Sequence, residues 1–225
     1  MSVAATRRDT ALVAVLTVLS ATAALAFLVR VGLRSGRGQD WDDSAMRTVV
    51  AGRDAQLTLL SVLGYVSIGA ILAVALGCAV VALLRGRPRV GAAAAVVLLG
   101  ANLTTQILKE TILDRPDLGF GTLNSLPSGH TTVVASAVGA GLLVAPGALR
   151  PTVALAGGFA TTLTGASTIV AGWHRPADVM AALAVSLIWT AVVAAVLHGP
   201  RHPVGGTVAG AIAGCIGALA FLVAV

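Results

Sequence analysis

Long apolar segments constrain this chain more than any other feature. Seven follow one another, at about residues 10–31, 57–84, 90–108, 129–144, 152–172, 176–197 and 204–225. A helix of about 20 apolar residues crosses the hydrocarbon core of a bilayer. With 57% hydrophobic and 11% charged residues and a mean hydropathy of +0.94, no globular core could enclose this much apolar surface. The predicted fold class is therefore all-α, a polytopic transmembrane helical bundle with six core spans and a seventh C-terminal span, in a single integral membrane domain over residues 1–225.

Other readings of the same features are less favoured. Arg7 and Arg8 precede the first apolar segment as in a signal peptide, but the segment exceeds the roughly 15 residues of a hydrophobic signal region, so an uncleaved span is expected. The net charge of +6 comes without a basic run or interleaved aromatic residues, which argues against nucleic acid as a partner. Cys78 and Cys215 each lie inside an apolar segment, as buried thiols rather than disulfide or zinc ligands.

The connectors between the segments give an orientation. The short turn with Arg85, Arg87 and Arg89 favours the cytoplasmic side, which puts the opposite ends of its neighbours on the non-cytoplasmic face of a bacterial-type plasma membrane. The longest connector, residues 32–55, is polar and mixed in charge. Two interpretations of it stay open, a solvated connector or a segment that lies partly in the headgroup region through Trp41.

Polar residues gather in three clusters at the ends of the middle apolar segments. These are Lys109 to Pro116, the tetrapeptide Pro127-Ser128-Gly129-His130, and Ser167 to Asp178. Successive spans alternate in direction, so the end of the third, the start of the fourth, the end of the fifth and the start of the sixth share one face. The sequence therefore predicts that the three clusters meet at one end of the bundle.

The third apolar segment also carries polar residues before its end. Asn102, Thr105 and Gln106 lie at helical spacing with Lys109, so they share one face of that helix. Polar groups are costly against lipid, so this face is expected to look into the bundle. Hydrogen bonding between helices and the lining of a headgroup pocket are both open explanations.

The residue types in the clusters indicate phosphate chemistry. Ser128 is a natural N-cap, and the unpaired N–H groups of the first helical turn at Gly129 attract an anion. Lys109 and Arg115 supply positive charge, and a guanidinium fits phosphate oxygens with two hydrogen bonds.

Two histidines suit two different tasks in such a site. His130 lies on the first turn of its helix, where it can give a proton to a departing oxygen. His174 and Asp178 are four residues apart at a helix start, so the carboxylate can hold one imidazole nitrogen and leave the other as a nucleophile.

Together the three clusters resemble the signature of the type 2 phosphatidic acid phosphatase superfamily, which includes membrane lipid phosphatases and vanadium haloperoxidases. That signature reads Lys-x6-Arg-Pro, Pro-Ser-Gly-His and Ser-Arg-x5-His-x3-Asp, and the resemblance covers about residues 56–197. It implies six spans with the clusters on one face and phosphate release without a metal or other cofactor. It also implies that His174 attacks phosphorus to form a phosphohistidine, Asp178 orients it, His130 protonates the leaving oxygen, and four residues hold the phosphoryl oxygens: Lys109, Arg115, Ser128 and Gly129.

The chain departs from that signature in two places. Five residues rather than six separate Lys109 from Arg115, and Thr168 stands where the family has an arginine. Loss of a guanidinium removes transition-state stabilisation from an electrostatic site. Arg175 is a candidate replacement, an interfacial anchor is the alternative explanation for it, and Ser167 and Thr168 are secondary members of the predicted site.

The predicted function is that of an integral membrane phosphatase acting on an isoprenoid diphosphate or a phosphatidic-acid-type lipid. A family member that binds or transports a lipid phosphate without turnover is the alternative. The haloperoxidase branch is disfavoured because those enzymes resemble soluble helical proteins. Gly206, Gly210 and Gly214 lie four apart in the last segment, a spacing that permits either homodimer formation or docking on the chain's own bundle.

Overall fold

A computed structural model describes residues 3–50, 52, 54, 68–120, 125–197 and 205–224. All regular structure within these ranges is helical, as predicted for an all-α fold. The α-helices of the described ranges are α1 (Val3–Leu28), α2 (Gly36–Val49), α4 (Ile68–Leu84), α5 (Pro88–Ile107), α6 (Gly129–Val144), α7 (Arg150–Val170), α8 (Pro176–Leu197) and α9 (Gly205–Ala224).

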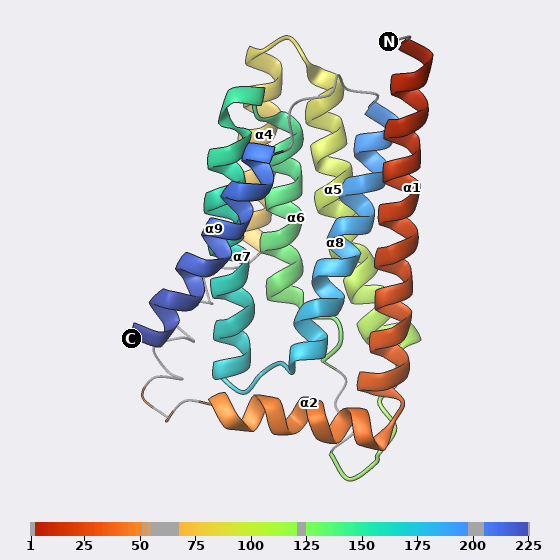
Figure 1. Ribbon diagram of the computed structural model, residues 1–225, viewed down its shortest axis with the longest axis vertical. Coiled ribbons are helices and arrows are strands. Elements are labelled where there is room, and N and C mark those ends of the chain that lie inside the picture. The colour runs from red at the N-terminus through yellow and green to blue at the C-terminus, as the bar shows by residue number, and fades with distance from the viewer. Residues whose placement is uncertain are drawn as a thin grey trace.

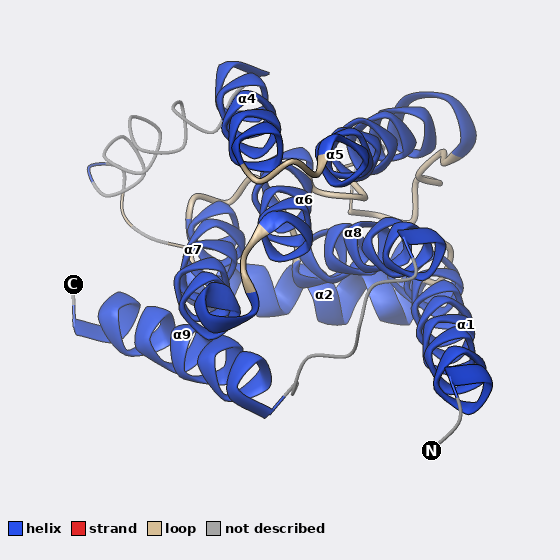
Figure 2. Ribbon diagram, turned by 90° about the horizontal axis from the view of Figure 1, so that it is seen from above, coloured by secondary structure: helices blue, strands red, loops and turns tan. Residues whose placement is uncertain are grey.

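Seven of these helices form a bundle, and α2 lies across one end of it (Figure 1). Helix α6 occupies the middle, where it packs against α4, α5, α7 and α8. Viewed from above, α1 lies outside α8 and α9 lies outside α7 (Figure 2). The three sequence clusters thus come from helices that neighbour one another at the centre of the bundle.

Four helical segments are long and apolar enough to cross a membrane, which fits the predicted membrane protein. They are Ala11–Leu33, Pro88–Ile112, Gly147–Val170 and Pro176–Leu197. Three shorter apolar helices, Leu72–Leu84, Gly129–Val144 and Thr207–Ala218, accompany them. The count of six core spans and a seventh stays a prediction, and the first part of the predicted span at 57–84 lies outside the described residues.

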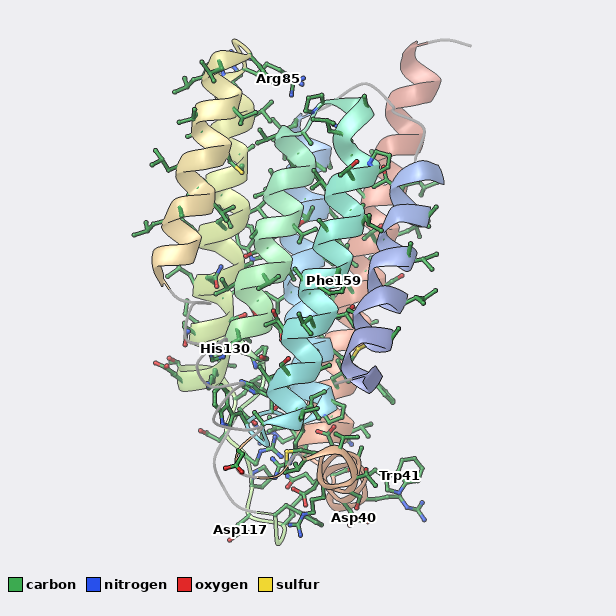
Figure 3. All side chains as sticks on the ribbon, turned by 90° about the vertical axis from the view of Figure 1, so that its left-hand side faces the viewer. Asp40, Trp41, Arg85, Asp117, His130 and Phe159 are labelled. Carbon is green, nitrogen blue, oxygen red and sulfur yellow. The ribbon has the colours of Figure 1, made fainter. Side chains whose placement is uncertain are left out.

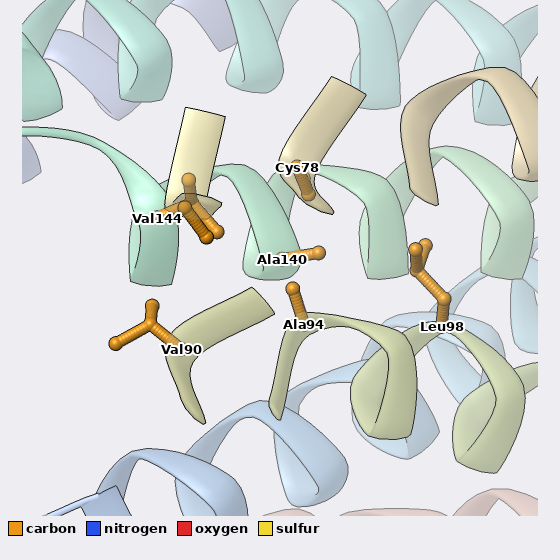
Figure 4. Close-up of a cluster of buried hydrophobic side chains, with 7 residues drawn as sticks. Cys78, Val90, Ala94, Leu98, Ala140 and Val144 are labelled. Atoms are coloured by element: carbon orange, nitrogen blue, oxygen red, sulfur yellow. The ribbon is translucent and has the colours of Figure 1, made fainter. Parts of the chain in front are cut away.

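Small side chains allow close packing at the end of the bundle away from α2. Ala82, Val90, Ala94, Leu98 and Ala140 belong to a buried cluster that joins α4, α5 and α6, together with Cys78 and Val144 (Figure 4). Lipid tails are as apolar as these side chains, so close van der Waals contact, rather than escape from water, holds such helices together.

Helix α9 docks on α7 through its small residues. A methyl group on Gly214 would collide with the backbone carbonyl of Leu155, and one on Gly210 with that of Pro151. On the other helix, a methyl group on Gly158 would meet the carbonyl of Ala211. The glycine spacing seen in the sequence therefore serves contact within the chain, and the homodimer stays a prediction.

The polar segment at residues 32–55 contains a helix rather than a simple connector. Ser35 caps α2 by accepting a hydrogen bond from the Gly38 amide on its side-chain oxygen. The face buried against the bundle carries Gln39, Asp42 and Asp43, whereas Trp41 is exposed. Gln39, Asp42 and Asp43 lie at helical spacing, so this polar face is the one that the helix presents to the protein.

One predicted boundary and the predicted orientation of one side chain need correction, and the bounds of two helices agree. The helix expected to end at about residue 108 continues as a π-helical turn, η2 (Leu108–Ile112), so the connector expected from Glu110 begins at Leu113. On the polar face of α5, Asn102 and Thr105 do look inward, donating to or sharing hydrogen bonds with α6, but Gln106 is exposed. The predicted bounds of α6 and α8 match those of the structure.

Candidate active site

The predicted site residues lie at the end of the bundle that α2 covers. His130 is near this end, Asp117 and the α2 residues Asp40 and Trp41 lie beyond it, and Arg85 is at the opposite end (Figure 3). The three clusters, which are far apart in the sequence, therefore meet at one end, as the alternation of spans predicted.

The start of α6 is built as the sequence predicted. Ser128 is fully buried and caps the helix, its side-chain oxygen accepting from the Thr131 amide at 3.4 Å and from the Thr131 hydroxyl at 3.1 Å. The Ser128 amide donates to the Asp178 carbonyl at 2.9 Å, which ties the mouth of α6 to the start of α8.

The His174 and Asp178 side chains are in contact. Asp178 Oδ2 lies 3.3 Å from His174 Nδ1, and both side chains are buried. Because Nδ1 contacts a carboxylate, the orientation of the imidazole is fixed. The other ring nitrogen, Nε2, is then available as a nucleophile.

Asp178 is held by two further donors to the same oxygen. Ser125 Oγ donates to Oδ2 at 2.6 Å, and the Arg175 amide donates to it at 2.9 Å. Ser125 was not among the predicted residues, because a serine in a loop two residues before Pro127 carries no signal that it faces a carboxylate 53 residues away. These bonds favour the ionised form of Asp178 and fix its direction towards His174.

The imidazole of His130 lies close to that of His174. The ring centroids of His130 and His174 are 6.4 Å apart with a near edge-to-face geometry, and Trp173 lies 5.8 Å from His130. The amides of Trp173 and His174 both donate to the Thr168 carbonyl, at 3.0 and 3.2 Å, which shapes the turn that carries His174. Both imidazoles are thus close enough to reach one phosphoryl group.

Arg115 brings a buried positive charge to this site. Its side chain is fully buried, and within the described residues none of its three guanidinium nitrogens has a hydrogen-bond acceptor. The nearest carboxylate oxygen is Asp178 Oδ1, 3.8 Å from Nη2. Burial lowers the pKa of this guanidinium from its ordinary value, and the neighbouring charge of Arg175 acts in the same direction. An unsatisfied buried cation is costly unless an anion joins it.

Lys109 and Gly129 complete the set that the sequence proposed around a phosphate. Lys109 is half-buried in η2, and its charge acts on His130 across the site. Gly129 leaves room over the helix start, since a methyl group there would have Gln106 Nε2 as its nearest neighbour at 3.9 Å. Both residues therefore lie at the same end as the histidines.

The position of the missing arginine is occupied without a cation. Thr168 is fully buried and its hydroxyl donates to the Gly165 carbonyl at 2.7 Å, while the neighbouring Ser167 is also buried. Arg175, the candidate replacement, has other partners: its guanidinium donates to Asp43 at 3.2 Å and to the Phe120 carbonyl at 3.0 Å.

Two aspartates of α2 reach the site and were not among the predicted residues. Asp42 Oδ1 accepts from the Ala177 amide at 2.9 Å, and Asp43 pairs with Arg175. Burial raises the pKa of Asp42 from 3.8 to about 6, although the Ala177 hydrogen bond opposes this, and the Asp178 charge adds to the rise. The helical spacing of Gln39, Asp42 and Asp43 was the signal that a polar helix face covers this end.

Within the described residues, no group of three or more histidine, cysteine, aspartate or glutamate side chains has the arrangement of a metal site. The long apolar helices fit an integral membrane protein. The chain belongs to the PAP2 superfamily, since the family model of that description matches residues 90–201. This superfamily includes phosphatases that act on lipid phosphates. No curated protein and no solved structure matches the chain.

Proposed function

We propose that this protein is an integral membrane lipid phosphatase that works through a phosphohistidine on His174. The observation that carries the proposal is the pairing of His174 Nδ1 with Asp178 at 3.3 Å, with the His130 ring 6.4 Å away between centroids. One imidazole is thus oriented for attack while a second lies across the space where a phosphoryl group fits.

The reaction proceeds in two displacements. His174 Nε2 attacks phosphorus with its lone pair, the bond from phosphorus to the lipid-side oxygen breaks, and His130 gives a proton to that oxygen. Water then attacks the phosphohistidine, the phosphorus–nitrogen bond breaks, and His130 takes up the proton that the water loses. Asp178 holds Nδ1–H throughout and stabilises the imidazole as positive charge develops on it.

Four residues are proposed to hold the phosphoryl oxygens. Arg115 contributes a guanidinium for which the described part of the chain offers no hydrogen-bond acceptor, Lys109 a second positive charge, and Ser128 and Gly129 the start of α6. A phosphate would satisfy the buried Arg115 nitrogens, and the helix N-terminus would favour its negative charge. Ser167 and Thr168 are secondary members, and Thr168 supplies no charge where the family signature has an arginine.

The proposed substrate is an isoprenoid diphosphate or a phosphatidic-acid-type lipid, cleaved without a metal ion. The site is proposed to open on the non-cytoplasmic face, because the arginine-rich turn at residues 85–89 is at the opposite end of the bundle from His130 (Figure 3). A lipid phosphate held at the boundary keeps its charged group near water and its tail among apolar helices.

The test is release of inorganic phosphate from both lipid classes in detergent, with a metal chelator present. The wild-type protein is expected to turn over at least one of them, to be inhibited by vanadate, and to lose turnover in His174→Ala. His202 lies outside the three sequence clusters and has no proposed role. His202→Ala therefore serves as the matched control and is expected to keep full turnover.

Two results would contradict the proposal. Unchanged rates in His174→Ala would remove that residue from its role as nucleophile. Tight binding of a lipid phosphate by folded wild-type protein without any phosphate release would favour the non-catalytic alternative, which the uncharged Thr168 supports.

A further inference from the structure

Helix α2 lies outside the part of the chain that the family model matches, yet its buried face touches the site. The family match covers residues 90–201, whereas α2 spans Gly36–Val49 and lies across the site end of the bundle (Figure 1). Its outward face exposes Trp41 and Asp40, and its inward face buries Asp42 and Asp43. An interfacial helix normally turns its apolar face inward, so two buried adjacent carboxylates require an explanation.

Asp42 acts on the helix that carries Asp178. Its Oδ1 accepts a hydrogen bond from the Ala177 amide in the first turn of α8, at 2.9 Å. The first N–H groups of a helix have no partner within it, and a carboxylate there also meets the positive end of the helix dipole. Asp42 therefore caps α8 from another helix, one residue before Asp178.

Asp43 acts on the residue that follows His174. The Arg175 guanidinium donates to Asp43 Oδ1 from Nη2 at 3.2 Å and from Nε at 3.4 Å, and Nη2 also donates to the Phe120 carbonyl at 3.0 Å. The other Asp43 oxygen pairs with Arg47 on the exposed side of α2 at 2.6 Å. The Asp43–Arg175 pair is largely buried, so solvent screens it much less than it screens Arg47.

The segment between α7 and α8 needs such support. Gly172 has a φ of +73°, a left-handed conformation, and residues 171–175 form no helix. Within this segment the Trp173 and His174 amides are held by the Thr168 carbonyl, and Arg175 is held by Asp43. His174 thus lies between an anchor on α7 and an anchor on α2.

We propose that α2 is a clamp, with Asp42 and Asp43 as positioning residues. They fix the start of α8 and the adjoining turn, so that Asp178 holds His174 in the orientation from which it attacks the substrate phosphate. The inference rests on the proposed phosphatase function. It adds to that function two residues that the family signature does not contain and assigns Arg175 to the clamp.

The test compares substitutions of the clamp with a matched substitution on the same helix. Asp42→Ala and Asp43→Ala are each expected to lower kcat roughly 100-fold with KM little changed, as expected when a reacting group is displaced by about 1 Å. Asp42→Asn, which keeps an acceptor for the Ala177 amide, is expected to recover most of the rate. Asp40→Asn removes an exposed carboxylate from α2 and is expected to keep wild-type kcat.

A double-mutant cycle separates positioning from general damage to the fold. If Asp43 acts through Arg175, then Asp43→Ala with Arg175→Ala is expected to be no slower than either single variant, whereas independent losses would multiply. Thermal unfolding in detergent of all variants shows whether each is folded at the assay temperature. Arg47→Ala, which removes only the exposed partner, is expected to change kcat less than two-fold.

The possible outcomes distinguish failure of the clamp hypothesis from failure of the proposed phosphatase function. Wild-type turnover that is lost in His174→Ala but kept in folded Asp42→Ala and Asp43→Ala overturns the clamp alone. Equal losses in Asp40→Asn also overturn it, because a general effect of charge on α2 would then explain the data. Absence of turnover in folded wild-type protein overturns the proposed function, and the clamp fails with it.

Discussion

The two ends of the bundle are held together by different interactions. At the end near α2, buried charges and hydrogen bonds join segments far apart in the sequence, such as Asp43 with Arg175 and Ser125 with Asp178. At the other end, between α4, α5 and α6, small apolar residues such as Ala94 and Ala140 pack closely (Figure 4). One polar contact in that region is the bond from Arg85 to the Val144 carbonyl.

This difference teaches which substitutions should affect turnover and which should affect folding. Polar contacts at the site depend on direction, so removal of one hydrogen-bonding partner misplaces a reacting group. Packing at the other end depends on volume, so an added or removed methyl group strains the helices without reaching the site. The two ends should therefore respond separately to substitution.

Of the three substitutions that test this comparison, Asp178→Asn is expected to have the largest effect. An amide in this position no longer stabilises a positive imidazole and favours the wrong tautomer of His174, so kcat should fall by a factor on the order of 10⁴. Phosphate release at saturating lipid measures this, and thermal unfolding in detergent should show a folded protein. A kcat within ten-fold of wild type would mean that the carboxylate does not orient the nucleophile.

A smaller effect, on stability rather than on turnover, is expected for Ala94→Leu. Ala94 is fully buried between α4 and α6 neighbours, so extra methylene groups should cost about 1–3 kcal/mol in stability through overpacking. The unfolding temperature in detergent should fall, while kcat per folded molecule stays at the wild-type value. A large loss of kcat in folded protein would show that the two ends are coupled.

The smallest effect near neutral pH is expected for Asp42→Asn, which should change mainly how stability depends on pH. The folded protein keeps a proton on Asp42 up to about pH 6, whereas an unfolded chain loses it near 3.8. Stability should therefore be highest, as far as this group is concerned, below about pH 4, and should fall as the pH rises to 6, by at most about 1 kcal/mol per pH unit. The groups facing Asp42 are Asp178 on α8, Arg175 and Arg115.

The measurement is the difference between wild type and Asp42→Asn in unfolding temperature from pH 4 to pH 7. The variant should lack this part of the pH dependence, because an amide does not titrate. Parallel curves for the two proteins would show that Asp42 keeps its ordinary pKa and is less buried than its surroundings indicate.

Much of the candidate site could be predicted because its residues follow local rules. Ser128 caps α6 through contacts within three residues, and His174 meets Asp178 because residues four apart share a helix face. The predicted bounds of α6 and α8 agree with the structure for the same reason, since Pro176 and the Ser128-Gly129 pair are local start signals. The alternation of spans correctly predicted that the clusters share one end.

The remaining features depend on contacts between segments with no shared local pattern. Ser125 bonds to a carboxylate 53 positions away, and Asp43 to a guanidinium 132 positions away. The sequence of residues 32–55 was compatible with a solvated connector or a headgroup segment, and only the packing of α2 across the bundle showed a buried acidic face. Likewise the glycines of α9 were compatible with two partners until their contacts with α7 were seen.

The sequence by itself determined the apolar helices and their approximate limits, because hydropathy and helix capping depend on residues close together in the chain. It also determined that the histidines gather at one end of the bundle, because successive spans alternate in direction. Only the tertiary structure decided which charged and polar side chains pair with one another. The interaction energy of two charges depends on the distance between them. The distance between α2 and the turn before α8 depends on how the whole bundle packs.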